Sequence, residues 1–342
     1  MAKIFYKAII FCSNPLRGVF KFEDVFQIYP IQSANAPQSN RVKMYPAIIE
    51  YHVEDNIEIA VPDFLGDLKD YAVKQTVTQN YQRRLRNLLS AITNYWFYFP
   101  RQEVKWFVDL PEGELDSKQM NAQCSKAGIS TYWYPQLLEE SRITAFTDTS
   151  HIRPAPLVKH PECFMNIDLE GEEEIRFPDH TIEAINNYFA LNTAGLDAVD
   201  SATSLICNGI NLMNEMKSIS FISFISSIET MVNYEFKGVR IESCEACGQP
   251  RYKVVRKFRD YLEKYVSDST SAKKQFREIY GLRSQIAHTG MLLLGDGIID
   301  WSEETGTGQR ALHLNAMQTS RLSLTNWLLR REEEQQMGQA DT

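Results

Sequence analysis

The chain has 342 residues, of which 44% are hydrophobic, 23% charged and 11% aromatic, and its net charge is −8. This composition excludes a wholly disordered chain, because disorder goes with low hydrophobicity and high charge. The length favours two domains, at roughly 100–200 residues each. No stretch approaches the roughly 20 apolar residues of a membrane span, and the N-terminal residues lack the pattern of a secretory signal. We therefore expect a cytoplasmic protein without a membrane segment.

The first half of the chain mixes strand and helix patterns. Segments rich in β-branched and aromatic residues predict strands over 4–11, 42–51 and 57–61. Apolar residues at helical spacing predict a helix over 77–97. A strand, a helix and a further strand follow over 104–134, an order that suggests a parallel βαβ unit. We therefore expect a mixed α/β domain over 1–150, with a role in sensing a trigger or selecting a substrate.

Residues 151–178 resemble a linker, because four of the 13 prolines and an acidic run at 170–174 interrupt regular structure there. Beyond them the pattern becomes helical. Apolar stripes predict helices over 205–216, 221–232, 252–265, 271–289 and 314–330. We expect an all-α bundle of five or six helices over 179–335, followed by a frayed tail over 336–342. The predicted fold class is α+β overall.

The basic residues are unevenly distributed. The acidic average argues against broad coating of nucleic acid, which depends on Lys and Arg contacts with phosphates. Residues 251–283, however, contain ten Lys or Arg and four Asp or Glu, a local charge of +6. Such a stretch is either a patch that attracts anions or the solvated face of two helices.

The predicted helix over 271–289 carries the most informative side chains. Residues at steps of three and four predict one face of it: Phe276, Ile279, Tyr280, Arg283, Ile286 and Ala287. Arg283 thus occupies a position typical of an apolar residue, and a charge that leaves water there needs a partner or a ligand. Gly290 favours a left-handed end of the helix. His288 then lies in the last turn, where the helix dipole favours the protonated imidazole.

Two interpretations of these residues stay open on spacing alone. Arg283 forms a structural ion pair, for which Glu229 is a candidate partner, or Arg283 and His288 are catalytic. A resemblance to a known protein family supports the second interpretation. Arg283 and His288 match the R-x4-H signature of the HEPN superfamily (higher eukaryotes and prokaryotes nucleotide-binding domain), late in the penultimate long helix of a C-terminal bundle.

The chain resembles the ApeA-like branch of that superfamily in particular, over about residues 180–335. Three features carry this likeness: the Ile228-Glu229 pair in an earlier helix, the segment Cys244-Glu245-Ala246-Cys247-Gly248-Gln249, and the basic-aromatic helix after it. The resemblance implies a metal-independent endoribonuclease without a cofactor, working as a homodimer in which the Arg and His of both subunits line one cleft. It further implies cellular RNA, including tRNA, as the substrate, and a role in antiviral defence or as a toxin.

Carried onto this chain, the resemblance assigns roles to single residues. His288 would take the proton of the ribose 2′-hydroxyl or protonate the leaving 5′-oxygen, and Arg283 would stabilise the charge that develops on the phosphate. Ser284, which stands where active members often have Asn, Asp or His, would position the phosphate or the imidazole. Glu229 and Tyr280 would support the pair. The predicted RNA contacts are Arg251, Lys253, Arg256, Lys257 and Arg259.

Three alternatives remain. In the first, the bundle is a non-catalytic module that dimerises or binds a nucleotide. In the second, Asp63, Glu103 and Lys105 form the Asp…Glu-x-Lys core of a magnesium-dependent nuclease in the first domain. The third concerns Cys244 and Cys247, which supply two of the four ligands that structural zinc requires. They are either reduced thiols, as we expect for all six cysteines, or one half of a zinc site shared by two subunits.

Overall fold

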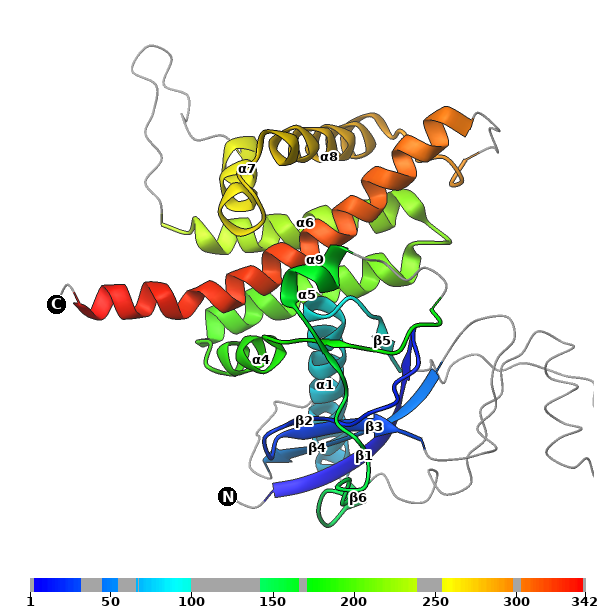
Figure 1. Ribbon diagram of the computed structural model, residues 1–342, viewed down its shortest axis with the longest axis vertical. Coiled ribbons are helices and arrows are strands. Elements are labelled where there is room, and N and C mark those ends of the chain that lie inside the picture. The colour runs from blue at the N-terminus through cyan, green and yellow to red at the C-terminus, as the bar shows by residue number, and fades with distance from the viewer. Residues whose placement is uncertain are drawn as a thin grey trace, which may run out of the picture. The chain divides into compact units, whose positions relative to one another are not determined.

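The computed structural model describes residues 3–31, 45–54, 66, 68–99, 142–165, 171–238, 254–297 and 303–340. These residues confirm the predicted α+β class, with an antiparallel sheet and a helix first and packed helices after them (Figure 1). The chain divides into two compact units. The first, here the sheet unit, comprises Met1–Arg86, Tyr95–Val158 and Asn166–Phe177, and the second, the helical unit, comprises Asn87–Asn94, Lys159–Met165 and Pro178–Thr342.

The sheet unit is built on strands in the order β2-β3-β4-β1-β5, with β6 also paired to β1. Their bounds are β1 (Lys3–Cys12), β2 (Phe20–Phe22), β3 (Phe26–Pro30), β4 (Tyr45–Glu54), β5 (Phe97–Tyr98) and β6 (Arg142–Ile143). The long central pair, β1 and β4, runs antiparallel from Lys3 opposite Glu54 to Cys12 opposite Tyr45. The strands predicted over 4–11 and 42–51 are therefore confirmed within the described residues. The strand predicted over 57–61 and the parallel βαβ unit over 104–134 lie outside them.

The predicted helix over 77–97 forms α1 (Lys69–Ile92), which begins earlier and ends five residues sooner than expected. The prediction was wrong at this end because tertiary hydrogen bonds replace helical ones. The carbonyl oxygen of Trp96 accepts from the backbone N–H of Ser13 at 2.9 Å, and Phe97 then pairs with β1 in strand β5. Earlier in α1, Tyr81 stacks on Tyr51 of β4 with ring centroids 5.5 Å apart.

Residues 142–150, here called the strap, dock on the sheet through a buried carboxylate. Glu50 of β4 has no exposed surface. Its oxygens accept hydrogen bonds from Gln27 Nε2 (2.7 Å), Tyr29 Oη (2.7 Å) and both the backbone N–H (2.8 Å) and Oγ1 (2.6 Å) of Thr147. The ring of Phe146 packs edge-on against Phe5, with centroids 5.1 Å apart. The strap thus contacts β1 through Phe146 and β4 through Thr147. Strand β3 donates to the same carboxylate of Glu50.

The segment expected as a linker contains short regular elements and contributes residues to both units. They are β7 (Leu157–Val158), paired with β8 (Phe177–Pro178), and the short helix α3 (His160–Met165). Phe177 stacks on Phe20 of β2, with ring centroids 4.2 Å apart, so one end of the segment belongs to the core of the sheet unit.

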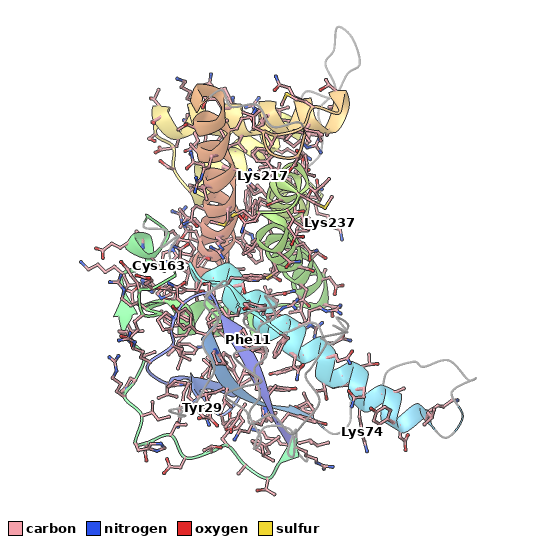
Figure 2. All side chains as sticks on the ribbon, turned by 90° about the vertical axis from the view of Figure 1, so that its right-hand side faces the viewer. Phe11, Tyr29, Lys74, Cys163, Lys217 and Lys237 are labelled. Atoms are coloured by element: carbon pink, nitrogen blue, oxygen red, sulfur yellow. The ribbon has the colours of Figure 1, made fainter. Side chains whose placement is uncertain are left out.

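The part of the helical unit described after residue 178 contains six helices. They are α4 (Thr181–Phe189), α5 (Thr193–Leu212), α6 (Lys217–Glu235), α7 (Val254–Tyr265), α8 (Thr270–Thr289) and α9 (Glu303–Ala340). Helix α6 packs against α5, α7, α8 and α9. Figure 2 labels Lys217, its first residue, and Lys237, which lies two residues beyond its last. Its residues Phe221, Phe224 and Ile225 are fully buried. Among the described helices, none combines the length and the apolar character needed to cross a bilayer.

Among these six, α5 and α9 differ most from their predicted bounds. Helix α5 ends at Leu212 rather than at 216, because Met216 already precedes the first turn of α6. Helix α9 extends the segment predicted over 314–330 at both ends and continues through 331–340, into the residues expected to fray. The first backbone N–H groups of α6 are capped from a distant loop, since Asp296 accepts from Lys217 at 2.7 Å and from Ser218 at 2.5 Å.

Candidate functional site

Helix α8 carries the predicted site and is held firmly at both ends. The Ser269 side chain accepts from the backbone N–H of Ala272 at 3.2 Å, which is an N-cap. Gly290 adopts φ +70° at the C-terminal end, as the sequence predicted. The face that packs into the unit consists of Phe276, Ile279, Leu282 and Ile286. Ala287 was expected on this face but is exposed, because Leu282 lies closer to the centre of the buried stripe.

Arg283 lies at the edge of this face and contacts helix α6. Its Nη2 donates to Glu229 Oε2 at 3.1 Å, with the side chains 25% and 18% exposed. The guanidinium carbon also lies 5.9 Å from the ring centroid of Tyr280. The Tyr280 ring in turn contacts Phe258 of α7, with centroids 4.9 Å apart. Three helices therefore meet around one half-buried ion pair.

The electrostatics of this site follow from that packing. Burial raises the pKa of Tyr280, and the negative charge of Glu229 raises it further, while Arg283 acts in the opposite direction. Tyr280 is therefore a neutral phenol at physiological pH. It offers an aromatic surface beside the guanidinium.

His288 is separated from this group. It is exposed in the last turn of α8, and no hydrogen bond or ion pair holds it among the described residues. Five residues correspond to about 7.5 Å along a helix and about 140° around it, so one copy of α8 presents Arg283 and His288 on different faces. Of the predicted residues, Glu229 and Tyr280 lie close to Arg283. Ser284, the next residue in the sequence, is half-buried.

The predicted RNA contacts that the structure describes lie on α7 and have partners within the unit. Arg256 is 3.7 Å from Asp260, and Arg259 is 3.1 Å from Glu263. Lys257 Nζ lies 5.9 Å from the ring centroid of Phe236. Each of these two arginines of α7 is thus paired with a carboxylate one helical turn towards the C-terminus. Arg251 and Lys253 lie outside the described residues.

The remaining predicted site residues also lie outside the described part of the chain: Asp63, Glu103, Lys105, Cys244 and Cys247. Within the described ranges, no group of three or more His, Cys, Asp or Glu side chains is arranged to hold a metal ion. The cysteines that are described, Cys12, Cys163 and Cys207, are buried and form no disulfide.

The structure also contains a serine–histidine contact that the sequence did not reveal. Ser220 Oγ lies 2.8 Å from His313 Nε2 and 2.6 Å from the carbonyl oxygen of Gly209. Because the single hydroxyl proton is donated to that carbonyl, the imidazole must donate to Ser220 rather than accept from it. His313 therefore does not activate Ser220 as a nucleophile. The two residues are 93 positions apart, so no local pattern could have paired them.

Comparisons with known proteins found no match to a family model, to a curated protein or to a solved structure. Function is therefore inferred from the arrangement of Arg283, Glu229, Tyr280 and His288 in α6 and α8, and from the resemblance of their motif.

Proposed function

We propose that this protein is a metal-independent endoribonuclease of the HEPN type that cuts cellular RNA, tRNA being one candidate, in antiviral defence or a toxin-like role. The observation that carries the proposal is the difference in burial between the two R-x4-H residues on α8. The Arg283 side chain is three-quarters buried between helices, whereas His288 is exposed at the end of the same helix. One side chain suits charge stabilisation and the other suits proton transfer.

The chemistry assigned to these residues needs no redox partner. The ribose 2′-oxygen attacks the adjacent phosphorus while the bond from phosphorus to the 5′-oxygen breaks, which leaves a 2′,3′-cyclic phosphate and a 5′-hydroxyl. One imidazole accepts the 2′-hydroxyl proton, and another group donates a proton to the 5′-oxygen. Arg283 stabilises the negative charge on the non-bridging oxygens, for which its planar array of donors is well suited.

The separation of Arg283 and His288 around α8 supports a site made by two copies of the chain. In a symmetric pair, the His288 of one copy can approach the phosphate bound by Arg283 of the other. Two imidazoles then meet one phosphodiester, which supplies both the base and the acid that the reaction requires. The proposed partners are therefore RNA and a second copy of the same chain.

The decisive experiment is RNA cleavage in EDTA by wild type, His288→Ala and His151→Ala. We expect His288→Ala to lose at least about a hundredfold in rate, the usual scale of general acid–base catalysis. His151, an exposed histidine of the sheet unit, is the matched control and should leave the rate unchanged. The products should carry cyclic phosphate termini. If His288→Ala cuts total RNA or tRNA at the wild-type rate, the proposed mechanism is wrong.

The ion pair itself favours one competing function, a non-catalytic module that dimerises or binds a nucleotide. In that case Arg283 is structural, and Arg283→Ala lowers the free energy of unfolding by about 1–3 kcal/mol, because the carboxylate of Glu229 loses its partner. Glu229 keeps some access to solvent, which limits this loss. Denaturant unfolding beside the cleavage assay separates the two functions, since a module shows the loss of stability and no cleavage by any form.

A further inference from the structure

The ion pair between Arg283 and Glu229 uses only part of the guanidinium. An arginine has five N–H donors in a planar fork. Among the described residues, one nitrogen of Arg283, Nη2, donates to a carboxylate oxygen, Glu229 Oε2, at 3.1 Å. A quarter of the Arg283 side chain remains exposed. The guanidinium is therefore held by a single hydrogen bond beside the Tyr280 ring, and the Arg283 side chain keeps some access to solvent.

A carboxylate on this guanidinium competes with any phosphate that approaches it. Carboxylates and phosphates bind arginine with the same forked geometry. Glu229 comes from α6 and Arg283 from α8, so each is positioned by its own helix rather than by the other. A phosphate that binds Arg283 must therefore either displace the carboxylate or share the guanidinium with a like charge close by.

We propose that Glu229 is an electrostatic gate on Arg283, which neutralises the guanidinium at rest and yields it only to a polyanion bound through several phosphates. This inference rests on the proposed function and adds a regulatory element to the same site. Isolated phosphates and mononucleotides bind poorly because they offer too few contacts to replace the ion pair. A strand of RNA has further phosphates, whose contacts elsewhere compensate for the separation of Glu229 from Arg283.

A gating role and a positioning role for Glu229 predict opposite changes in RNA affinity and cleavage rate when its charge is removed. Glu229→Gln keeps the size of the side chain and its acceptor oxygen but removes the charge. If Glu229 gates Arg283, this variant should bind a non-cleavable 2′-deoxy-substituted RNA oligomer about three- to tenfold tighter, and it should cleave RNA faster. If Glu229 mainly orients Arg283, both binding and cleavage should weaken.

The measurement is fluorescence anisotropy of a labelled oligomer over a range of salt concentrations. Glu278→Gln is the matched control, because it lies on α8, pairs with Lys274 at 3.8 Å and removes the same charge. It should change affinity less than twofold. The slope of log K against log salt should stay close to that of wild type for Glu229→Gln, because both proteins make the Arg283 contact once the oligomer is bound. Combining Glu229→Gln with Arg283→Ala should abolish the gain.

Each outcome decides the proposal. Affinity no tighter than that of Glu278→Gln, or a gain that survives Arg283→Ala, overturns the gate. Tighter binding through Arg283 without cleavage by any form supports the gate and refutes the endoribonuclease instead. If Glu229→Gln fails to fold by circular dichroism, Glu229→Asp replaces it, because its shorter side chain draws the charge away from Arg283. A smaller gain in affinity then supports the gate, and no gain overturns it.

Discussion

A half-buried glutamate and a buried histidine of the helical unit show how local partners decide the favoured charge. Glu235 accepts hydrogen bonds from Lys264 Nζ (2.8 Å), Tyr265 Oη (2.8 Å) and Trp327 Nε1 (2.9 Å). Burial opposes its ionisation, but these donors together lower its pKa. No carboxylate in the described part of the chain hydrogen-bonds to His313, and burial lowers its pKa to about 4. The folded state therefore favours a charged Glu235 and a neutral His313.

We predict that His313 makes the helical unit sensitive to mild acid. Its folded pKa of about 4 lies below the value near 6.5 of an unfolded chain. Between these values the unfolded state binds a proton that the folded state does not. The free energy of unfolding should therefore be unaffected by this group above pH 6.5 and fall by up to roughly 3 kcal/mol as the pH approaches 4.

Urea unfolding at pH 7 and pH 4.5 measures this effect. His313→Gln keeps a donor near Ser220 but cannot titrate, so wild type should lose roughly 2–3 kcal/mol more than the variant between the two pH values. Carboxylates contribute equally to both proteins and cancel in the comparison. Equal losses would show that His313 does not control the acid response.

At the scale of elements, α5 and α6 approach closely at a glycine. A Cβ built on Gly209 would lie 2.5 Å from a ring carbon of Phe224, which is itself fully buried. We predict that Gly209→Ala destabilises the unit by about 1–3 kcal/mol, the usual cost of overpacking a core. Gly281→Ala is the matched control, because nothing lies within 4 Å of its Cβ position on α8. It should be neutral or stabilise by up to about 1 kcal/mol. Thermal unfolding of both variants tests the difference.

The strap of the sheet unit provides a second prediction at this scale. Glu50→Gln replaces one carboxylate oxygen by an NH₂ group, which faces donors from Gln27, Tyr29 or Thr147 instead of accepting from them. We expect a loss of about 2–4 kcal/mol, because hydrogen bonds to a buried charged group are lost and polar groups are left unpaired. Hydrogen exchange should show faster exchange of the Thr147 backbone N–H. Wild-type exchange at Thr147 would exclude the carboxylate as the anchor of the strap.

At the scale of the whole molecule, the net charge of −8 and the carboxylates beside the basic residues of α7 argue against binding RNA through one broad surface. In the proposed endoribonuclease, RNA recognition would instead depend on a few placed cations, which a site shared by two chains would concentrate. A site shared by two chains would let two different inactive variants restore activity when they are mixed, whereas a site within a single chain would not.

We predict that Arg283→Ala and His288→Ala proteins, each inactive alone, recover part of the RNA cleavage when they are mixed and allowed to exchange subunits. A mixed pair retains one guanidinium and one imidazole in the common cleft, whereas each homogeneous pair lacks one of the two groups altogether. The cleavage rate of the mixed pair should stay below that of wild type, because the second imidazole is missing. Sedimentation should show a dimer for both variants. Persistent inactivity of a mixture that demonstrably forms mixed dimers would exclude a shared site.

The sequence was sufficient where the determining interactions are local. Helix α8 follows from apolar residues at steps of three and four, and its end at Gly290 follows from the left-handed conformation that glycine adopts readily. The long strands β1 and β4 follow from their β-branched and aromatic residues. Prediction was wrong at Phe97, because a strand of two residues depends on its partner β1 and not on any pattern of its own.

By itself, the sequence determined the α+β order of the chain, the apolar stripes of the helices and the five-residue spacing of Arg283 and His288. Only the tertiary structure decided that Glu229, among the possible partners, lies 3.1 Å from Arg283, that Tyr280 packs on Phe258 of α7 and that Asp296 caps α6. Helix periodicity specifies which face of a helix is apolar, whereas contacts between residues more than 50 positions apart depend on how the helices pack.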